Sequence, residues 1–296
     1  MNRWVEAARL RTLPLTVACI LLGNAVAFSN NCFRLIIFVL SIVTALLLQV
    51  IANFANDLGD AQKGTDDHTR VGPKRLVSFG LISVQEMYQG IAVAITVCSI
   101  LGLLLLYISF GTDWYSLGIF VFFGVCSILA ALGYTLGKYA YGYHGLGDVF
   151  SFLFFGILGV LGSFYLQDHS NCLPLLLLGC AHGFLVVAVL NVNNMRDYQG
   201  DKIKGKRTVV VKFGPNFGTV YHCFLIMASL VCYTYYAISN EKYYSFIFIA
   251  GYAVLFLSLR RIMLRNVRNY NIDPELKRTS VGALLVAVLF SAGLTC

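Results

Sequence analysis

The sequence predicts an all-α polytopic membrane protein with about nine transmembrane helices. Of its 296 residues, 58% are hydrophobic and only 12% are charged, whereas a soluble globular protein carries roughly 25% charged residues. Apolar stretches recur along the chain, and each approaches the roughly 20 residues that a helix needs to cross about 30 Å of hydrocarbon. No polar segment is long enough for a separate soluble domain, so we expect a single domain over residues 1–296.

Hydropathy places the nine helices in order along the chain. The first is expected to remain in the protein, because RTLPLTVACILLGNAVAF lacks a convincing small-residue cleavage site and further spans follow it. The expected spans are 12–29, 35–55, 88–110, 116–136, 147–167, 173–194, 218–238, 244–262 and 279–295.

The basic residues of the loops orient these helices. If the N-terminus is cytoplasmic, all 22 Lys and Arg residues except Arg34 and Lys242 fall on the cytoplasmic face, as the positive-inside rule requires. The net charge of +8 is therefore concentrated on one face, where it attracts anionic lipid headgroups or anionic substrates. These charges border apolar spans, so we expect no nucleic-acid partner.

Two polar stretches that follow the second and sixth expected helices repeat one pattern. A shift of 141 residues superimposes NFANDLGDAQKG, residues 53–64 (motif one), on residues 194–205 (motif two). Both stretches read Asn-x-x-(Asn/Asp)-x-x-x-Asp-x-x-Lys-Gly. Both lie on the expected cytoplasmic face with four helices between them, an arrangement consistent with an internal structural repeat.

The acidic residues of the two motifs predict a metal site. Residues i and i+4 of a helix project from one face, so Asn56 lies with Asp60, and Asp197 lies with Asp201. Two such oxygen-rich edges facing each other would repel unless a cation lay between them. Carboxylate and amide oxygens suit Mg²⁺, which binds phosphate together with one or two carboxylates. The expected metal-binding residues are Asn56, Asp57, Asp60, Asp197 and Asp201.

Basic residues follow each acidic group and indicate that the ligand is a diphosphate. Lys and Arg side chains can bind phosphate oxygens and, with a metal ion, stabilise the charge on a departing diphosphate. Alternatively, these could be ordinary solvated loops whose charges only set the orientation of the helices. The spacing repeated in both loops argues against that alternative. Lys63 joins Asp60, Asp197 and Asp201 as a catalytic candidate. The expected diphosphate contacts are Arg70, Lys204, Lys206 and Arg207, with Arg75 also basic after motif one and Arg196 able to orient a carboxylate.

A third loop on the same face, Tyr134 to Phe150, is rich in Gly and Tyr. Tyrosines at a membrane interface are often belt residues. The functional alternative is a lid over the site, in which the aromatic face of Tyr134 stabilises a developing carbocation. We therefore include Tyr134 among the catalytic candidates.

These motifs resemble those of the UbiA superfamily of intramembrane prenyltransferases. The 1,4-dihydroxy-2-naphthoate polyprenyltransferase branch of menaquinone synthesis is the most similar. The resemblance is carried by RTLPL at 11–15, NDLGDAQKGTD at 56–66, RVGPKR at 70–75, GLGDVFSFLFFG at 145–156 and NNMRDYQGDKIKGKRT at 193–208. One departure is TLGKYAYG after Tyr134, where that branch would be expected to carry a Gly-Gly-Pro turn.

The resemblance implies a UbiA-type bundle with a cytoplasmic-side active site in the bacterial inner membrane. Its substrates would be polyprenyl diphosphate and 1,4-dihydroxy-2-naphthoate, its cofactor Mg²⁺, and its products demethylmenaquinol and carbon dioxide. Asn56, Asp57 and Asp60 would bind one side of the diphosphate through Mg²⁺, and Asp197 and Asp201 the other. The prenyl tail would lie among the apolar helices, because water would be a poor solvent for it.

Two alternatives remain at this stage. Another acceptor, such as 4-hydroxybenzoate, homogentisate or a porphyrin, would use the same diphosphate site. A transporter or cation channel would also carry intramembrane carboxylates, but here the acids lie at helix ends and the other spans carry almost no ionizable residues.

Overall fold

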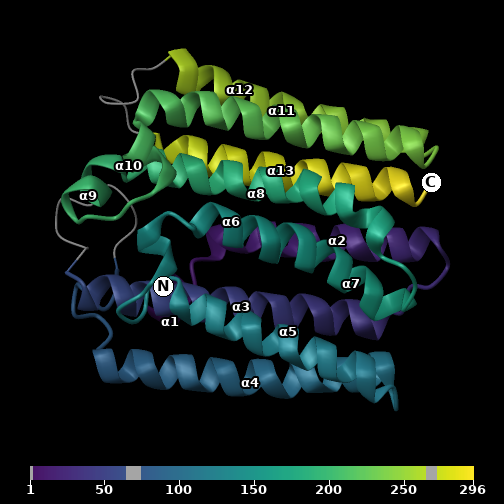
Figure 1. The fold of residues 1–296 in the computed structure, drawn as a ribbon, viewed down its shortest axis with the longest axis horizontal. Helices are drawn as coiled ribbons and strands as arrows, with labels where there is room; N and C mark the ends of the chain where they lie inside the picture. Colours follow the sequence, from purple (N-terminus) through teal and green to yellow (C-terminus); the bar gives the residue numbers. More distant parts are fainter. Residues whose placement is uncertain (1–2, 65–74, 265–271) are drawn as a thin grey trace.

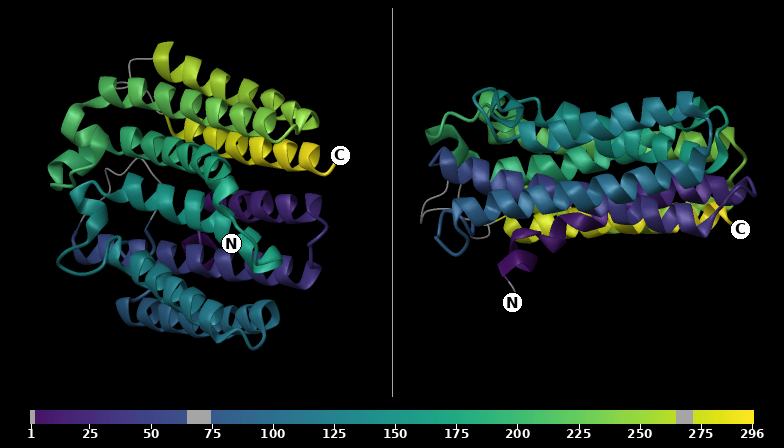
Figure 2. Two further views of the ribbon diagram at one scale, coloured as in Figure 1. Left: turned by 45° about the vertical axis from the view of Figure 1, so that its right-hand side comes forward. Right: turned by 90° about the horizontal axis from the view of Figure 1, so that it is seen from below.

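The chain folds as a bundle of long helices that run side by side (Figure 1). The computed structural model describes residues 3–64, 75–264 and 272–296, and in that part of the chain all the regular structure is helical. A view from below shows the same helices stacked in more than one layer (Figure 2).

The helices of the first half are α1 (Arg3–Ala7), η1 (Leu10–Thr12), α2 (Leu13–Ser29), α3 (Leu35–Gln62), α4 (Val84–Phe110), α5 (Trp114–Gly133) and η2 (Tyr141–His144). A continuous rod over Gly147–Asp168 follows, made of α6 (Gly147–Ser151), the π-helix η3 (Phe152–Leu158) and α7 (Gly159–Asp168). The remaining elements are η4 (Leu173–Leu175), α8 (Leu176–Arg196), α9 (Tyr198–Ile203), α10 (Val209–Phe213), α11 (Pro215–Ser239), η5 (Tyr243–Phe248), α12 (Ile249–Leu264) and α13 (Asp273–Leu294).

The predicted fold class is confirmed. Within the described residues, eight helical segments are long and apolar enough to cross a membrane, and they correspond to the second to ninth predicted spans. The shorter apolar helix α2 corresponds to the first predicted span, 12–29. The protein is therefore an integral membrane protein. The largest differences from the expected boundaries are at two helices: α3 continues to Gln62 and α13 begins at Asp273. Hydropathy detects only the apolar part of a helix, whereas the backbone hydrogen bonds continue through polar residues that face the interior.

The central helix α8 packs closely against the π-helical part of the Gly147–Asp168 rod. A Cβ atom on Gly156 would lie 2.7 Å from the Cα atom of Gly183 and 2.7 Å from the carbonyl oxygen of Gly179. Only glycines allow this separation. π-Helical turns are rare and are often found near functional sites, and this one faces the cavity described below.

Motif one and motif two lie at the same end of the bundle, which we call the polar end. It is formed where α3 ends at Gln62 and where α8 ends at Arg196, on the left of Figure 1. This shared position agrees with an internal repeat, although the repeat itself stays a prediction.

Candidate active site

A long cavity of 1470 Å³ runs from the polar end into the bundle. At the polar end it is lined by Asn56, Asp60, Asp197 and Asp201. Farther along, where α4 ends and α5 begins, its walls are apolar and include Leu105, Leu106 and Phe120. The cavity therefore combines a charged entrance with an interior suited to a long hydrocarbon chain.

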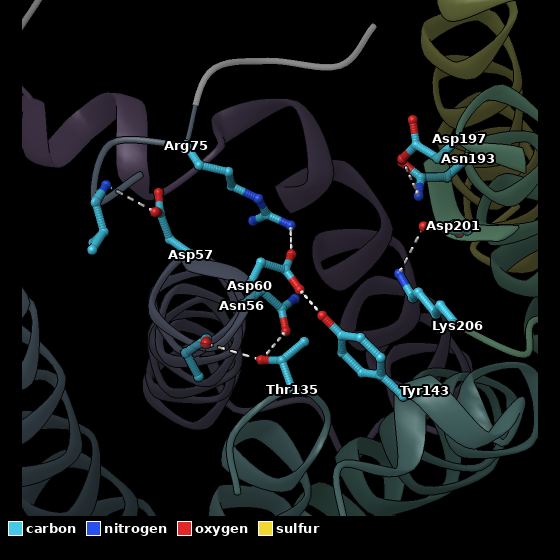
Figure 3. A network of polar contacts seen from close by, with 12 residues as sticks. Asn56, Asp57, Asp60, Arg75, Thr135, Tyr143, Asn193, Asp197, Asp201 and Lys206 are labelled. Carbon is cyan, nitrogen blue, oxygen red and sulfur yellow. Dashed lines mark hydrogen bonds and ion pairs between the residues drawn. The ribbon is translucent and has the colours of Figure 1, made fainter. Parts of the chain in front are cut away.

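Motif one occupies the last turns of α3, and its side chains point in two directions (Figure 3). Asn56 and Asp60 line the cavity. Asp57 points elsewhere: the residue is 1% exposed, and its carboxylate accepts hydrogen bonds from the backbone N–H groups of Leu76 at 3.0 Å and Val77 at 3.1 Å. Asp57 was predicted as a metal ligand. The structure places it against the backbone of the segment that follows motif one.

Asp60 is held by two side chains from other segments. Arg75 forms a buried ion pair with it, and the Tyr143 hydroxyl donates to its Oδ1 at 2.8 Å. Asn56 lies beside it, and its Oδ1 is 3.1 Å from the hydroxyl of Thr135. A Cβ atom on Gly59 would lie 2.8 Å from the backbone of Thr135. The glycine of motif one therefore lets the end of α5 approach α3.

Motif two spans the junction between α8 and α9, on the opposite wall (Figure 3). Arg196 is only 2% exposed at its side chain and binds Asp197 through two hydrogen bonds of 2.8 Å. Its third nitrogen donates to Asp273 at the start of α13, at 2.7 Å. Asp201 pairs with Lys206 at 3.7 Å. These contacts hold both carboxylates of motif two beside the cavity.

Tyr143 connects the two motifs. Its ring centroid lies 3.9 Å from Nζ of Lys63 and 5.7 Å from Nζ of Lys206. Its carbonyl oxygen accepts the backbone N–H of Arg207 at 2.9 Å. The sequence left two interpretations of the Gly- and Tyr-rich loop open, a belt at the membrane interface or a lid over the site, and it did not single out Tyr143. Nothing in its spacing distinguishes Tyr143 from the other tyrosines of that loop.

The surroundings of Lys63 and Lys206 shift their pKa values in opposite directions. Burial lowers the pKa of Lys63, and the nearby Asp60 opposes this effect only in part. Burial also acts to lower the pKa of Lys206, but Asp201 and the other surrounding acids outweigh it, so the pKa of Lys206 is raised. Lys206 therefore keeps its positive charge over a wider pH range than Lys63.

Tyr134 lies at the end of α5 and lines the cavity. Burial raises the pKa of its phenol, so the hydroxyl stays protonated. Its ring meets Tyr141 edge-on at 5.3 Å between centroids, and Tyr141 stacks on Phe150 at 4.1 Å. Aromatic rings thus border the cavity next to its charged end.

The remaining predicted residues are placed as follows. Lys204 and Lys206 line the cavity, whereas Arg207 contributes a backbone contact and is not among the cavity residues. Arg70 lies outside the described residues. In the described part of the chain no three His, Cys, Asp or Glu side chains gather into one metal cluster. The acids are instead divided between two facing walls, and their carboxylate and amide oxygens are the donor types that suit Mg²⁺.

Comparison with known proteins identifies the family. Residues 15–272 match the model of the UbiA prenyltransferase family. A 1,4-dihydroxy-2-naphthoate octaprenyltransferase of Escherichia coli is 39% identical over 292 residues, which cover 98% of this chain and 94% of that protein. One of Haemophilus influenzae is 38% identical over 298 residues, covering 99% and 96%.

Solved structures share the fold. An apo UbiA homolog from Aeropyrum pernix K1 has a TM-score of 0.67 at 15% identity, covering 99% of this chain and 98% of that chain. A UbiA homolog from Archaeoglobus fulgidus, bound to DMAPP and Mg²⁺, has a TM-score of 0.61 at 17% identity, covering 97% and 98%. The resemblance predicted from the motifs is confirmed: the chain belongs to the UbiA prenyltransferase family.

Proposed function

We propose that this protein transfers a polyprenyl group from polyprenyl diphosphate to 1,4-dihydroxy-2-naphthoate. The observation that carries the proposal is the pair of acidic walls, Asn56 with Asp60 and Asp197 with Asp201, at the charged end of one long apolar cavity. The relatives of Escherichia coli and Haemophilus influenzae, similar over nearly the whole chain, are named for this naphthoate acceptor. We place the protein in a bacterial inner membrane, as its named relatives are bacterial, with the polar end cytoplasmic, as the loop charges favour.

The two walls would bind the diphosphate from opposite sides. Asn56 and Asp60 would hold Mg²⁺ on one side, and Asp197 and Asp201 on the other, because their oxygens fit this ion. Bound there, Mg²⁺ would supply a Lewis acid that stabilises the negative charge on the departing diphosphate. Asp57 supports the site from outside the cavity, through its bonds to the backbone of Leu76 and Val77.

The basic residues have two roles: some bind the diphosphate, and others orient the carboxylates. Lys204 and Lys206 line the cavity and offer ammonium groups to phosphate oxygens. Lys63 lies over the Tyr143 ring, with its Nζ 3.9 Å from the ring centroid. Arg70 and Arg207 remain candidate contacts through the segments that flank the motifs. Arg75 and Arg196 fix the orientation of Asp60 and Asp197. Binding groups held in place before the reaction stabilise the developing charge without reorganising.

The reaction needs no oxidant, reductant or further substrate. The bond between the first prenyl carbon and the diphosphate oxygen breaks, and its electron pair leaves with the diphosphate. The ring carbon of the acceptor that carries the carboxylate forms a new carbon–carbon bond to that prenyl carbon. The carboxylate carbon then departs as carbon dioxide, its bonding electrons return to the ring, and demethylmenaquinol results. Tyr134 lines the cavity, where an aromatic ring would stabilise the allylic cation, and the apolar walls exclude water that would capture it.

An acceptor competition tests this function. Membranes containing the protein are incubated with Mg²⁺, a long polyprenyl diphosphate, and an equal mixture of 1,4-dihydroxy-2-naphthoate and 4-hydroxybenzoate, and the products are read by mass spectrometry. We expect a decarboxylated prenyl-naphthalenediol that disappears when a chelator is added. If prenylated hydroxybenzoate is the only product, the protein is a prenyltransferase but the proposed acceptor is wrong. No product from intact protein would overturn the proposed activity.

A further inference from the structure

The cavity has a second polar region between α2 and α13, and it lies next to motif one, because the hydroxyl of Thr12 accepts a hydrogen bond from Nδ2 of Asn53 at 3.2 Å. Asp273, Leu276, Lys277, Ser280 and Val281 of α13 line it, and their i, i+3, i+4, i+7 and i+8 spacing makes them one face of that helix. The wall opposite comes from η1 and the start of α2.

That opposite wall is also polar. It comprises Arg9, Thr12 and Thr16, with Leu15 between them, and all four line the cavity. We call the space between these residues and the α13 face the α2/α13 pocket. Nothing in the diphosphate chemistry described above uses it.

Two buried hydroxyl groups point to a ligand in the α2/α13 pocket. Thr16 is 2% exposed and Ser280 is 5% exposed, yet neither hydroxyl oxygen has a hydrogen-bond partner among the described residues. Buried polar groups are nearly always hydrogen-bonded, and leaving one unpaired is unfavourable. Since both residues line the cavity, a bound molecule with its own hydroxyl or carboxylate oxygens would supply the bonds that they lack.

The charge of the pocket indicates an anion of low charge. The carboxylate of Asp273 forms an ion pair with Arg196, whose Nη1 donates to its Oδ1 at 2.7 Å. Lys277, one turn farther along α13, adds an ammonium group to the same wall. The pocket holds fewer basic groups than the motif end, where several lysines and arginines would bind a diphosphate. It therefore suits a monoanion with hydroxyl groups.

The pocket is also next to the reacting end of the donor. Arg196 binds Asp197 of motif two with one edge and Asp273 of α13 with its remaining nitrogen. This single buried side chain separates the acids of motif two from the α13 face. A flat molecule in the pocket would lie beside the diphosphate end of the donor, where the new bond must form.

We propose that the α2/α13 pocket binds the aromatic acceptor. Lys277 forms an ion pair with its carboxylate, the hydroxyls of Thr16 and Ser280 bond to its ring oxygens, and Leu15, Leu276 and Val281 contact its apolar faces. The proposal rests on the proposed function, because it assumes a hydroxylated aromatic acid as the acceptor. It assigns acceptor recognition to residues outside both acidic motifs.

Steady-state kinetics of Lys277→Gln and Ser280→Ala test the assignment. Each substrate is varied at saturation of the other, with purified full-length protein in detergent. We expect the KM for 1,4-dihydroxy-2-naphthoate to rise about fivefold in Lys277→Gln and about threefold in Ser280→Ala, while the KM for the polyprenyl diphosphate stays unchanged.

Two matched variants serve as controls. Arg260→Gln removes one exposed positive charge from α12, near the same end of the bundle. Ser291→Ala removes another buried hydroxyl of α13 that has no partner in the described residues and does not line the cavity. Both should retain the acceptor KM of the unmodified protein.

A binding measurement distinguishes charge recognition from a packing effect. Quenching of protein fluorescence reports the affinities of 1-hydroxy-2-naphthoate and of 1-naphthol, which lacks the carboxylate. We expect the unmodified protein and Lys277→Arg to prefer the acid, and Lys277→Gln to lose this preference. The assignment of the pocket would be wrong if Lys277→Gln still preferred the acid to 1-naphthol. It would also be wrong if the variants raised the KM for the donor and left the KM for the acceptor unchanged.

Failure of the pocket and failure of the proposed function give different results. If the unmodified protein prenylates the naphthoate and the variants match it, only the pocket is overturned. If the unmodified protein neither prenylates the naphthoate nor binds 1-hydroxy-2-naphthoate, both proposals are overturned.

Discussion

The hydroxyl of Tyr143 donates a hydrogen bond of 2.8 Å to Oδ1 of Asp60. Tyr143 belongs to the loop after α5, and Asp60 to the last turn of α3. The same tyrosine accepts the backbone N–H of Arg207 at 2.9 Å, immediately after motif two. One residue therefore contacts both sides of the charged end, and it is well placed to keep their separation constant.

Tyr143→Phe is predicted to raise the KM for the prenyl diphosphate about tenfold, because a hydrogen bond to a charged group is lost while the ring beside Lys63 remains. Tyr143→Leu, which also removes the ring, should raise it further. Initial rates at varied donor concentration measure both effects. Tyr139→Phe in the same loop is the control, since Tyr139 is 81% exposed. A donor KM in Tyr143→Phe equal to that of the unmodified protein would contradict this role.

Asp60→Asn and Asp201→Asn are each predicted to lower turnover at least about 100-fold, because each removes one carboxylate from the group that stabilises the leaving diphosphate. Product formation under saturating Mg²⁺ measures the loss. Asp113→Asn, which keeps a helix-capping side chain at the other end of the bundle, should remain active. Substantial activity in both Asp60→Asn and Asp201→Asn would contradict the proposal that the two walls bind metal.

Arg196→Gln is predicted to destabilise the fold by about 3 kcal/mol or more, because it leaves Asp197 and Asp273 without their shared cation. Thermal unfolding in detergent, followed by circular dichroism without added metal, measures this change. Arg260→Gln is again the comparison, and its exposed side chain should matter little. Equal melting temperatures for the two variants would show that the buried pair is not structural.

Alkaline pH is predicted to weaken donor binding through Lys63. Because burial lowers the pKa of Lys63, it loses its charge at a lower pH than an ordinary lysine, whereas Lys206, whose pKa is raised, stays charged. The KM for the donor should therefore rise on the alkaline side as Lys63 deprotonates. Lys63→Arg should move that rise to higher pH, since arginine stays protonated. An identical pH profile for both proteins would exclude Lys63 as the responsible group.

Most of the fold follows from hydropathy and loop charge. Each predicted apolar span corresponds to a helix, because a membrane allows few other ways to satisfy the backbone. The junction after Arg196 was not predictable in the same way. There α8 gives way to α9 at Asp197, beyond the expected end of the sixth span at residue 194.

The site was predictable in its chemistry more than in its geometry. The i, i+4 spacing placed Asn56 and Asp60 together, and both line the cavity. The same periodicity turns Asp57, one residue after Asn56, about 100° around the helix, toward the backbone of Leu76. The contacts of Thr135 and Tyr143 arise between segments far apart in sequence, so no local pattern indicates them.

The central claim is that motif one and motif two bind one diphosphate from opposite sides. The most direct measurement is anomalous diffraction from crystals grown with Mn²⁺ in place of Mg²⁺ and with geranyl thiodiphosphate, a slowly reacting donor analogue. We predict metal peaks beside Asp60 and beside Asp197 and Asp201, with the diphosphate between them and the geranyl chain in the apolar cavity. Metal at only one wall, or a diphosphate bound elsewhere, would contradict this account.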